Sequence, residues 1–282
     1  MALLRVTSKC NQRCLFCSYP GDGPERERGL KSWLRELRGS EGGLVQISGG
    51  EPLLRRSADL ITLMEFCAGR RIQVEFQTNA VLLAGVGESG LRALVKAVGK
   101  TSGYFNVNFP SHDPSVDARI TGSPGNFAKR ERAVIRLLEA GAPVRITQVV
   151  NSLNYRLIPR FVAYLKKRLS GVGWVQFSFV KAAGRTLSSP GIVPSYRQVS
   201  GYLRRGLKAA SSAGIRCEVD HIPLCFLQDF WTSHVDVRKV LGGKPGPHQT
   251  EKQKIAKCAG CGFSTVCSGP RVDYLALRKA WR

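Results

Sequence analysis

The sequence predicts an α/β protein built as a partial (βα)6 barrel of the TIM type, with a small C-terminal domain. Six short segments rich in β-branched and aromatic residues recur about every 30 to 40 residues, and amphipathic stretches separate them. No G-x-G-x-x-G loop follows the first segment, which favours a barrel over a dinucleotide-binding sheet.

The elements are predicted in a regular order along the chain. The strands are expected at 3–8, 44–48, 72–77, 104–109, 144–150 and 174–180, and the helices near 28–38, 57–69, 89–98, 127–140 and 156–169. A Pro/Ser/Gly-rich linker, TLSSPGIVPS, then precedes a helix at about 196–213 and the segment IRCEVDHIPLCFL, which indicates a strand running into a loop. We therefore expect a core domain over 1–190 and a second region over 191–282.

Composition limits the class of protein. With 282 residues and 43% hydrophobic residues, the chain can bury a sizeable core. No apolar run approaches the roughly 20 residues that span a bilayer. The start, MALLRVTSKC, has no basic segment, long apolar segment or cleavage site of a secretory signal. The sequence thus predicts a cytoplasmic protein with no membrane partner.

The formal net charge of +23 predicts attraction to polyanions: nucleic acid, an acidic peptide or a phosphorylated small molecule. The Lys and Arg residues are spread through several predicted helices rather than gathered in one tract. A solvated basic surface is the alternative interpretation.

Each predicted strand ends in polar or glycine-rich residues: SKC, SGGEP, QTNA, NFPSHDP, QVVNSLN and KAAGR, in chain order. In βα barrels, the loops after the carboxyl ends of the strands converge over one mouth. Any one of these endings could be a simple turn, but six in succession predict a functional site at that end.

The nine cysteines are odd in number, and six of them fall in two tight clusters. In a chain without an export signal, such clusters indicate metal or iron–sulfur ligation rather than disulfides. Cys67 lies on an apolar helical face and is expected to be a buried structural thiol. Cys10, Cys14 and Cys17 are spaced C-x3-C-x2-C with no fourth Cys or His nearby in sequence. A remote ligand could complete a zinc site, or a [4Fe–4S] cluster could keep one iron open.

The first cluster resembles the signature of the radical S-adenosylmethionine (radical SAM) superfamily: C-x3-C-x-Φ-C directly after the first strand, with Phe16 as the aromatic Φ. The resemblance implies that the three thiolates hold three irons and that SAM chelates the fourth. A second mark is the glycine-rich SGGEP turn after the second strand, formed by Ser48, Gly49, Gly50, Glu51 and Pro52. Its glycines let the backbone approach a ligand, and Glu51 is expected to accept hydrogen bonds from the SAM ammonium.

Other strand ends resemble the family's SAM contacts more loosely. Thr78 and Asn79 match a pair under the cluster, Asn108 matches a polar residue near the SAM ribose or carboxylate, and Gln148 and Asn151 match contacts to adenine and ribose. Each of these residues is as readily explained as a turn or capping residue. Asn154 could cap the following helix. His112 could touch substrate or simply lie in a surface turn.

The C-terminal cysteines Cys258, Cys261 and Cys267 are spaced C-x2-C-x5-C. A zinc ribbon is one interpretation. Beside the first cluster, the arrangement resembles the twitch/SPASM extension, which holds an auxiliary [4Fe–4S] cluster. The full SPASM pattern would place another cysteine where this chain has Arg271. The resemblance implies one auxiliary cluster with Cys225 as the fourth ligand; Cys217 or a substrate group is the alternative.

By resemblance, the enzyme cleaves SAM reductively to a 5′-deoxyadenosyl radical, which abstracts hydrogen from a substrate. The expected reaction is an oxidative modification or cross-link of a ribosomal peptide. The alternatives are a small metabolite, RNA, or a non-enzymatic zinc or Fe–S nucleic-acid-binding protein. The expected cofactors are SAM and two [4Fe–4S] clusters, and the expected partner is a one-electron donor such as flavodoxin or ferredoxin.

Overall fold

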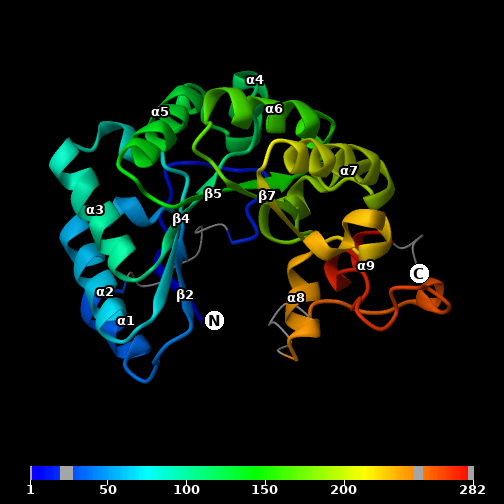
Figure 1. Cartoon of the computed structure of the whole chain (residues 1–282), viewed down its shortest axis with the longest axis horizontal. Coiled ribbons are helices and arrows are strands. Elements are labelled where there is room, and N and C mark those ends of the chain that lie inside the picture. The colour runs from blue at the N-terminus through cyan, green and yellow to red at the C-terminus, as the bar shows by residue number, and fades with distance from the viewer. Residues whose placement is uncertain (1, 20–27, 244–249, 279–282) are drawn as a thin grey trace. The chain divides into compact units, whose positions relative to one another are not determined.

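The computed structural model describes residues 2–19, 28–243 and 250–278. Its seven strands lie in one sheet in chain order, β1 to β7, and every strand pairing recorded in the described chain is parallel. The strands are β1 (Ala2–Thr7), β2 (Leu44–Gly49), β3 (Gln73–Thr78), β4 (Tyr104–Asn108), β5 (Val144–Val150), β6 (Trp174–Phe179) and β7 (Arg216–Asp220) (Figure 1). The predicted α/β partial barrel is confirmed, and all six expected strands are present within two residues.

The seventh strand is the main difference from the prediction. The segment IRCEVD does form a strand, but β7 pairs parallel with β6, with Val175 opposite Cys217 and Phe177 opposite Val219. The linker that precedes helix α7 (Tyr196–Ser212) interrupts the simple βα spacing, so the repeat in sequence ends one strand before the sheet does. The sheet therefore continues past the predicted boundary at residue 190.

The helices follow the strands as expected, with three additions. They are α1 (Leu30–Leu37), α2 (Ser57–Gly69), α3 (Glu88–Lys100), α4 (Pro114–Thr121), α5 (Asn126–Glu139), α6 (Ile158–Arg168), α7 (Tyr196–Ser212), α8 (Val235–Leu241) and α9 (Val272–Leu277). Helices α8 and α9 were not predicted, and neither was α4. Asp113 caps it by accepting hydrogen bonds from the Ser115 and Val116 backbone N–H groups, and Pro114 occupies its first position.

The chain divides into two compact units. The first comprises residues 1–13, 19–109 and 113–147, and the second 14–18, 110–112 and 148–282. In the first unit, the buried Leu60, Met64 and Cys67 of α2 show how a helix covers the sheet with its apolar face. No helix in the described part of the chain is long and apolar enough to cross a membrane. The boundary at residue 190 remains a prediction.

Candidate functional site

The first cysteine cluster lies in the loop that follows β1. Cys10 is exposed, Cys14 is buried and Cys17 is half-buried, and all are thiols rather than disulfides. The Cys17 N–H donates to the Cys14 carbonyl at 3.1 Å, so the last two cysteines share one tight turn. The Arg185 N–H donates to the Cys17 carbonyl at 2.9 Å. Phe16 is half-buried beside them.

The SGGEP loop is hydrogen-bonded to the segment that leads into Cys10. The Gly50 N–H donates to the Thr7 carbonyl and the Glu51 N–H to the Lys9 carbonyl, both at 2.8 Å. The backbones approach so closely that a Cβ on Gly50 would lie 2.0 Å from the Lys9 carbonyl oxygen. Gly49 adopts φ 131° and faces Thr7 in the same way. The two motifs, far apart in sequence, are therefore held together through main-chain contacts that require glycine.

Glu51 is fully buried, and its recorded contacts are internal. Its carboxylate accepts from the Thr78 hydroxyl at 2.6 Å, from the Asn79 N–H at 2.7 Å and from the Leu53 N–H at 3.2 Å. Burial raises the pKa of Glu51, while these hydrogen bonds act against that rise. Glu51 thus links the loop after β2 to the loop after β3. The expected contact with an ammonium group stays a prediction, and these internal contacts do not favour it.

Thr78 and Asn79 are part of this same linkage. The Asn79 side chain donates to the Asn11 side chain at 2.7 Å, and Asn11 is the residue after Cys10. Its carbonyl accepts from buried Arg130, which also pairs with buried Asp117. Sequence reasoning missed Asn11, Arg130 and Asp117. Arg130 and Asp117 are 13 residues apart in a predicted helix and a predicted loop, and this spacing carries no local signal in the sequence.

The polar side chains at the strand ends differ in whether they have a hydrogen-bond partner within the protein. Ser48 donates to Gln77 at 2.6 Å. The Asn108 Oδ1 and, in the second unit, the Gln148 Oε1 are buried without a hydrogen-bond partner among the described residues. A buried amide oxygen without a partner is unfavourable unless a ligand satisfies it. Both atoms therefore fit the expected role of a polar contact to a bound cofactor.

Asn151 instead serves its own turn. Its side chain accepts from the Leu153 N–H at 3.0 Å and donates to the Val149 carbonyl at 2.9 Å. The Asn154 side chain accepts from the Asn151 N–H at 2.8 Å and makes no capping hydrogen bond to a helix, so the capping prediction is wrong. The ring of half-buried His112 lies 5.9 Å from the Tyr164 ring and 6.4 Å from the Phe161 ring.

One face of β2 to β5 carries a polar network that sequence reasoning missed. Glu75 accepts from Gln46, Tyr104, Asn106 and Arg145 at 2.6 to 3.1 Å. Burial raises the pKa of Glu75, but the Arg145 charge and the hydrogen bonds outweigh it and hold the pKa below its usual value. The strand register places these residues beside one another on one face of the sheet. Polar and apolar residues alternate along each of these strands, and this alternation was the signal in the sequence that could have predicted the network.

In the second unit, Cys225 lies near enough to the C-terminal cysteines to interact with them electrostatically. Partial burial of the thiol, together with the neighbouring Cys267, Cys261 and Cys258, raises the pKa of Cys225 to about 11. Burial likewise raises the pKa of Cys217 to about 12, but there the added cause is Glu218 and not the cysteine group. Of the two candidates for the fourth ligand, Cys225 is the one that interacts with the other three.

The loop that carries Cys258, Cys261 and Cys267 is closed at its base by an antiparallel pairing. The Gln253 N–H donates to the Pro270 carbonyl and the Val272 N–H to the Glu251 carbonyl, both at 2.9 Å. Arg271, which stands where the full SPASM pattern would have a cysteine, bonds to Asp273 at 2.9 and 3.1 Å and also pairs with Glu251. This position therefore secures the loop by ion pairs.

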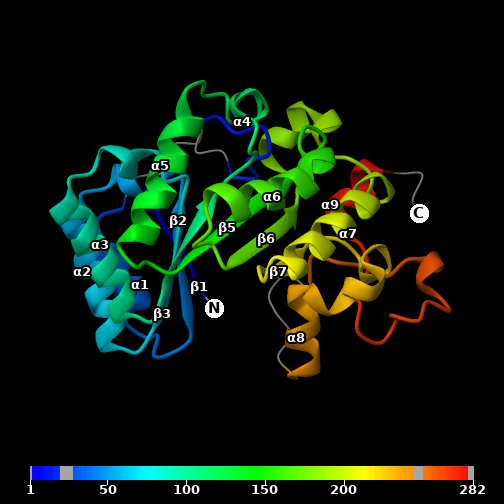
Figure 2. The same cartoon turned by 45° about the horizontal axis from the view of Figure 1, so that its top comes forward.

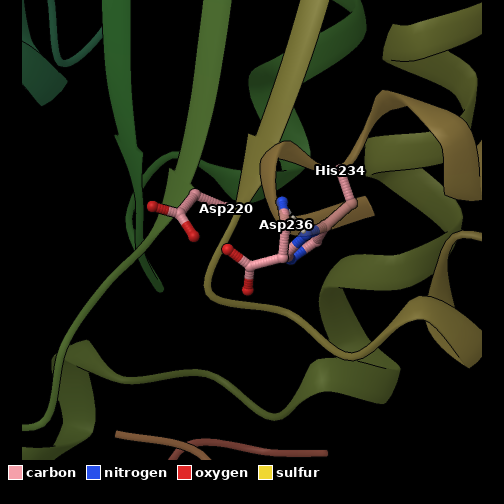
Figure 3. A group of neighbouring side chains, drawn as sticks. All are labelled: Asp220, His234 and Asp236. Atoms are coloured by element: carbon pink, nitrogen blue, oxygen red, sulfur yellow. Dashed lines mark hydrogen bonds between the residues drawn. The ribbon is translucent and has the colours of Figure 1, made fainter. Parts of the chain in front are cut away.

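Near this loop, Asp220, His234 and Asp236 bring three ligand-type atoms within 4.8 Å of one another (Figure 3). Asp236 already pairs with the ammonium group of Lys252. The His234 Nδ1 accepts from the Asp236 N–H at 3.1 Å. A cation here would have to compete with the lysine. We interpret the group as a buried charge network that supports the cysteine loop, since Lys252 lies in the base of that loop.

A parallel partial barrel with three cysteines after β1, pinned to a glycine-rich loop after β2, defines a class of proteins that hold an iron–sulfur cluster and SAM. The comparison with family models agrees: residues 4–158 match the Radical SAM superfamily, and the chain belongs to that family. The resemblance predicted from the motifs is thereby confirmed.

Individual relatives show how far the similarity extends. A probable GTP 3′,8-cyclase from Methanopyrus kandleri is 31% identical over 208 residues, which cover 69% of this chain and 60% of the relative. The PqqA peptide cyclase of Rhodopseudomonas palustris is 28% identical over 168 residues, covering 57% of this chain and 42% of the relative. The chain thus matches between two-fifths and three-fifths of these proteins' lengths.

A solved structure extends the likeness of fold to nearly the whole chain. The structure described as native anSMEcpe with bound AdoMet and Cp18Cys peptide superposes with a TM-score of 0.70 at 16% sequence identity, covering 96% of this chain and 88% of the other. At this level of identity the likeness concerns the fold alone. It includes the region after residue 158, beyond the family match.

Proposed function

We propose that this protein is a radical SAM enzyme that abstracts hydrogen from a peptide and leaves it oxidatively modified or cross-linked. The observation that carries the radical chemistry is the pinning of the SGGEP loop to the cysteine loop by the Gly50 and Glu51 N–H groups. When bound, the reduced cluster and SAM supply the chemistry: an electron enters the sulfonium, the C5′–S bond breaks, and the resulting radical takes a hydrogen atom from substrate.

This chain's residues would hold and orient the cofactors. Cys10, Cys14 and Cys17 would hold three irons. The Asn108 and Gln148 side chains would use their unpartnered oxygens to bind donor groups of SAM. Glu51 would act indirectly, because its carboxylate holds the loops after β2 and β3 in place. A one-electron carrier such as flavodoxin or ferredoxin would supply the electron.

The second cysteine group supports an oxidative outcome. Cys225, Cys258, Cys261 and Cys267 provide four thiolates, enough to complete the ligation of an auxiliary [4Fe–4S] cluster. A fully ligated cluster is suited to accept the second electron that a substrate radical must lose to become a closed-shell product. The substrate gives up two hydrogens in total, one as an atom to the deoxyadenosyl radical and one as a proton.

A peptide substrate is supported by the PqqA peptide cyclase among the sequence relatives and by the peptide-bound structural neighbour. A nucleotide is the second candidate, because the GTP 3′,8-cyclase relative is more similar in sequence. The two candidates can be tested side by side with the same preparation of enzyme.

The test is anaerobic reconstitution followed by turnover with SAM and a reductant. We expect roughly eight irons per chain, from two [4Fe–4S] clusters, and reductive release of 5′-deoxyadenosine. A precursor peptide encoded beside the gene should lose the mass of two hydrogens, and deuterium from the labelled peptide should appear in 5′-deoxyadenosine. Turnover of GTP with no change in the peptide would replace the peptide proposal. Colourless, zinc-containing protein without SAM cleavage would reject the radical mechanism.

A further inference from the structure

More than half of the net charge of +23 comes from one stretch of the chain, because that stretch has no acidic residue. Between residues 140 and 217 there are thirteen Lys and Arg residues and no Asp or Glu. Arg145, Lys181 and Arg216 pair with carboxylates from outside that stretch, at Glu75, Glu251 and Glu218. Most of the other cations lie on helices α6 and α7 or in the turns beside them. The two helices therefore have no acidic residue of their own to balance them.

Some of the cations on each of these helices share one side of the helix. On α6, Arg160 and Lys167 are exposed and seven residues apart. On α7, Arg197 and Lys208 are exposed, and Arg204 lies between them, half-buried. With 3.6 residues per turn, residues spaced by seven and eleven share one side of a helix. We call these five residues the basic face.

Helices α6 and α7 pack side by side within the second unit (Figure 2). A Cβ on Gly206 of α7 would lie 2.3 Å from the Ile158 Cγ2 of α6, which shows how near the helices approach. The rings of Tyr155 and Tyr202 meet edge to face at 5.4 Å at the same junction. The apolar sides of both helices are used in this packing, and Arg160, Lys167, Arg197 and Lys208 stay exposed.

We propose that the basic face docks an acidic segment of the peptide substrate. That the bound molecule is a peptide rests on the proposed function. That it binds at the basic face rests on the complementarity between acidic residues of the peptide and the cations of that face. Cations seven residues apart on a helix are separated by about 10 Å, which is close to the roughly 9 Å between every third residue of a peptide in the polyproline II conformation, where those residues share one side. Binding away from the reacting residues would raise the effective concentration of the peptide at the site.

The surface is less suited to nucleic acid. Single-stranded nucleic acid is commonly held by bases stacked on exposed aromatic rings. On α6 and α7, which the structure describes throughout, Phe161 and Tyr196 are buried and Tyr164 and Tyr202 are half-buried. No ring there is exposed, so phosphate attraction alone would have to provide the affinity. A carboxylate peptide needs only the cations.

The experiment measures binding rather than catalysis. The reconstituted full chain is titrated with a fluorescein-labelled Glu-Ser-Gly repeat of about 18 residues, in about 0.15 M salt, and anisotropy is recorded. The test variant carries Arg160→Gln, Lys167→Gln, Arg197→Gln and Lys208→Gln. The control removes as many exposed cations from α1, α3 and α5, through Lys31→Gln, Arg35→Gln, Lys96→Gln and Lys129→Gln. We expect binding to weaken about tenfold or more in the test variant and less than about twofold in the control.

Several results would overturn the proposal: equal weakening in both variants, no binding of the Glu repeat by the unmodified protein, or equal binding of a Gln-Ser-Gly repeat. Tighter binding of an RNA of similar length, lost in the test variant, would reassign the face to nucleic acid. A variant with Arg160→Gln and Lys167→Gln alone guards against loss of folding and should retain part of the effect. If binding depends on the face but no peptide is modified, the docking site stands and the proposed reaction fails.

Discussion

The two cysteine loops are built in different ways. The loop after β1 is held by main-chain hydrogen bonds to the SGGEP loop, and it offers three cysteines within eight residues. The C-terminal loop is closed by a short antiparallel pairing and by the ion pairs of Arg271, and Cys225 adds a fourth thiol from elsewhere in the chain. A three-thiol loop leaves a cluster iron open to a small molecule, whereas a four-thiol set completes the ligation. The comparison suggests that the first loop is for chemistry on SAM and the second for electron transfer.

The strongest test of this difference removes one cysteine from each loop. Cys14→Ala should lower the release of 5′-deoxyadenosine to background, because no reducible cluster would remain beside SAM. Cys261→Ala should retain SAM cleavage but lose the oxidised product. Cys67→Ala, in the buried core of α2, is the matched control and should retain full iron content. Equal loss of SAM cleavage in Cys14→Ala and Cys261→Ala would show that the two loops are not functionally distinct.

The pinning of the first loop can be broken without touching a thiol. In Gly50→Ala the new methyl group would overlap the Lys9 carbonyl, so the loop must shift, at about 1 to 3 kcal/mol of folding free energy. We expect weaker SAM binding and lower iron retention in that cluster, followed by absorbance and by SAM titration. Gly85→Ala, whose Cβ would meet no atom within 4 Å, should behave as the unmodified protein. Normal SAM binding in Gly50→Ala would contradict the pinning.

A third prediction concerns the C-terminal loop and asks which cysteine is the fourth ligand of its expected cluster. Cys225→Ser should lower iron from roughly eight to roughly four per chain, because one complete [4Fe–4S] cluster would be lost. Cys217→Ser should leave the iron content unchanged, since its thiol interacts with Glu218 rather than with the other cysteines. Iron analysis and Mössbauer spectra of the two variants decide between them. The opposite pattern would exchange their roles.

The smallest expected effect concerns pH. Burial lowers the pKa of His221 to about 3, well below its ordinary 6.5, despite the neighbouring Asp220. Between these values the unfolded chain binds a proton that the folded chain does not. Stability should therefore fall as pH drops below 6.5, by at most about 1.4 kcal/mol per pH unit from this group. Asn is among the residues that best tolerate the positive φ of His221. His221→Asn should flatten the pH dependence of the thermal midpoint between pH 7 and 5.5, and an unchanged slope would contradict this.

Much of the fold could be predicted because it depends on local pattern. Strands of five to seven residues bounded by glycine and polar turns were located within two residues, since β-branched and aromatic runs favour pleated, buried backbone. Strand β7 was identified as a strand but not as part of the sheet. Its pairing with β6 crosses a linker and a helix of 17 residues, and pairing over such a separation leaves no periodic signal in sequence.

In the candidate site too, features carried by contiguous residues could be predicted, whereas features that depend on contacts between elements could not. The cysteine spacings and the SGGEP turn could be identified from sequence because a few contiguous residues carry their chemistry. The role of Glu51 could not, because its hydrogen-bond partners at Thr78 and Asn79 come from the next strand. A carboxylate that looks available to a ligand in the sequence is buried once that strand is in place.

By itself, the sequence determined the class of this protein: a βα barrel with a three-cysteine motif, a glycine-rich loop and a second cysteine group. Tertiary structure decided which of Cys217 and Cys225 interacts with the other three cysteines, which carboxylates pair with Arg271, and which cations of the stretch without acidic residues are exposed. The physical reason is that ligation and ion pairing depend on distances in space. Spacing along the chain sets those distances within a turn, whereas packing sets them between elements.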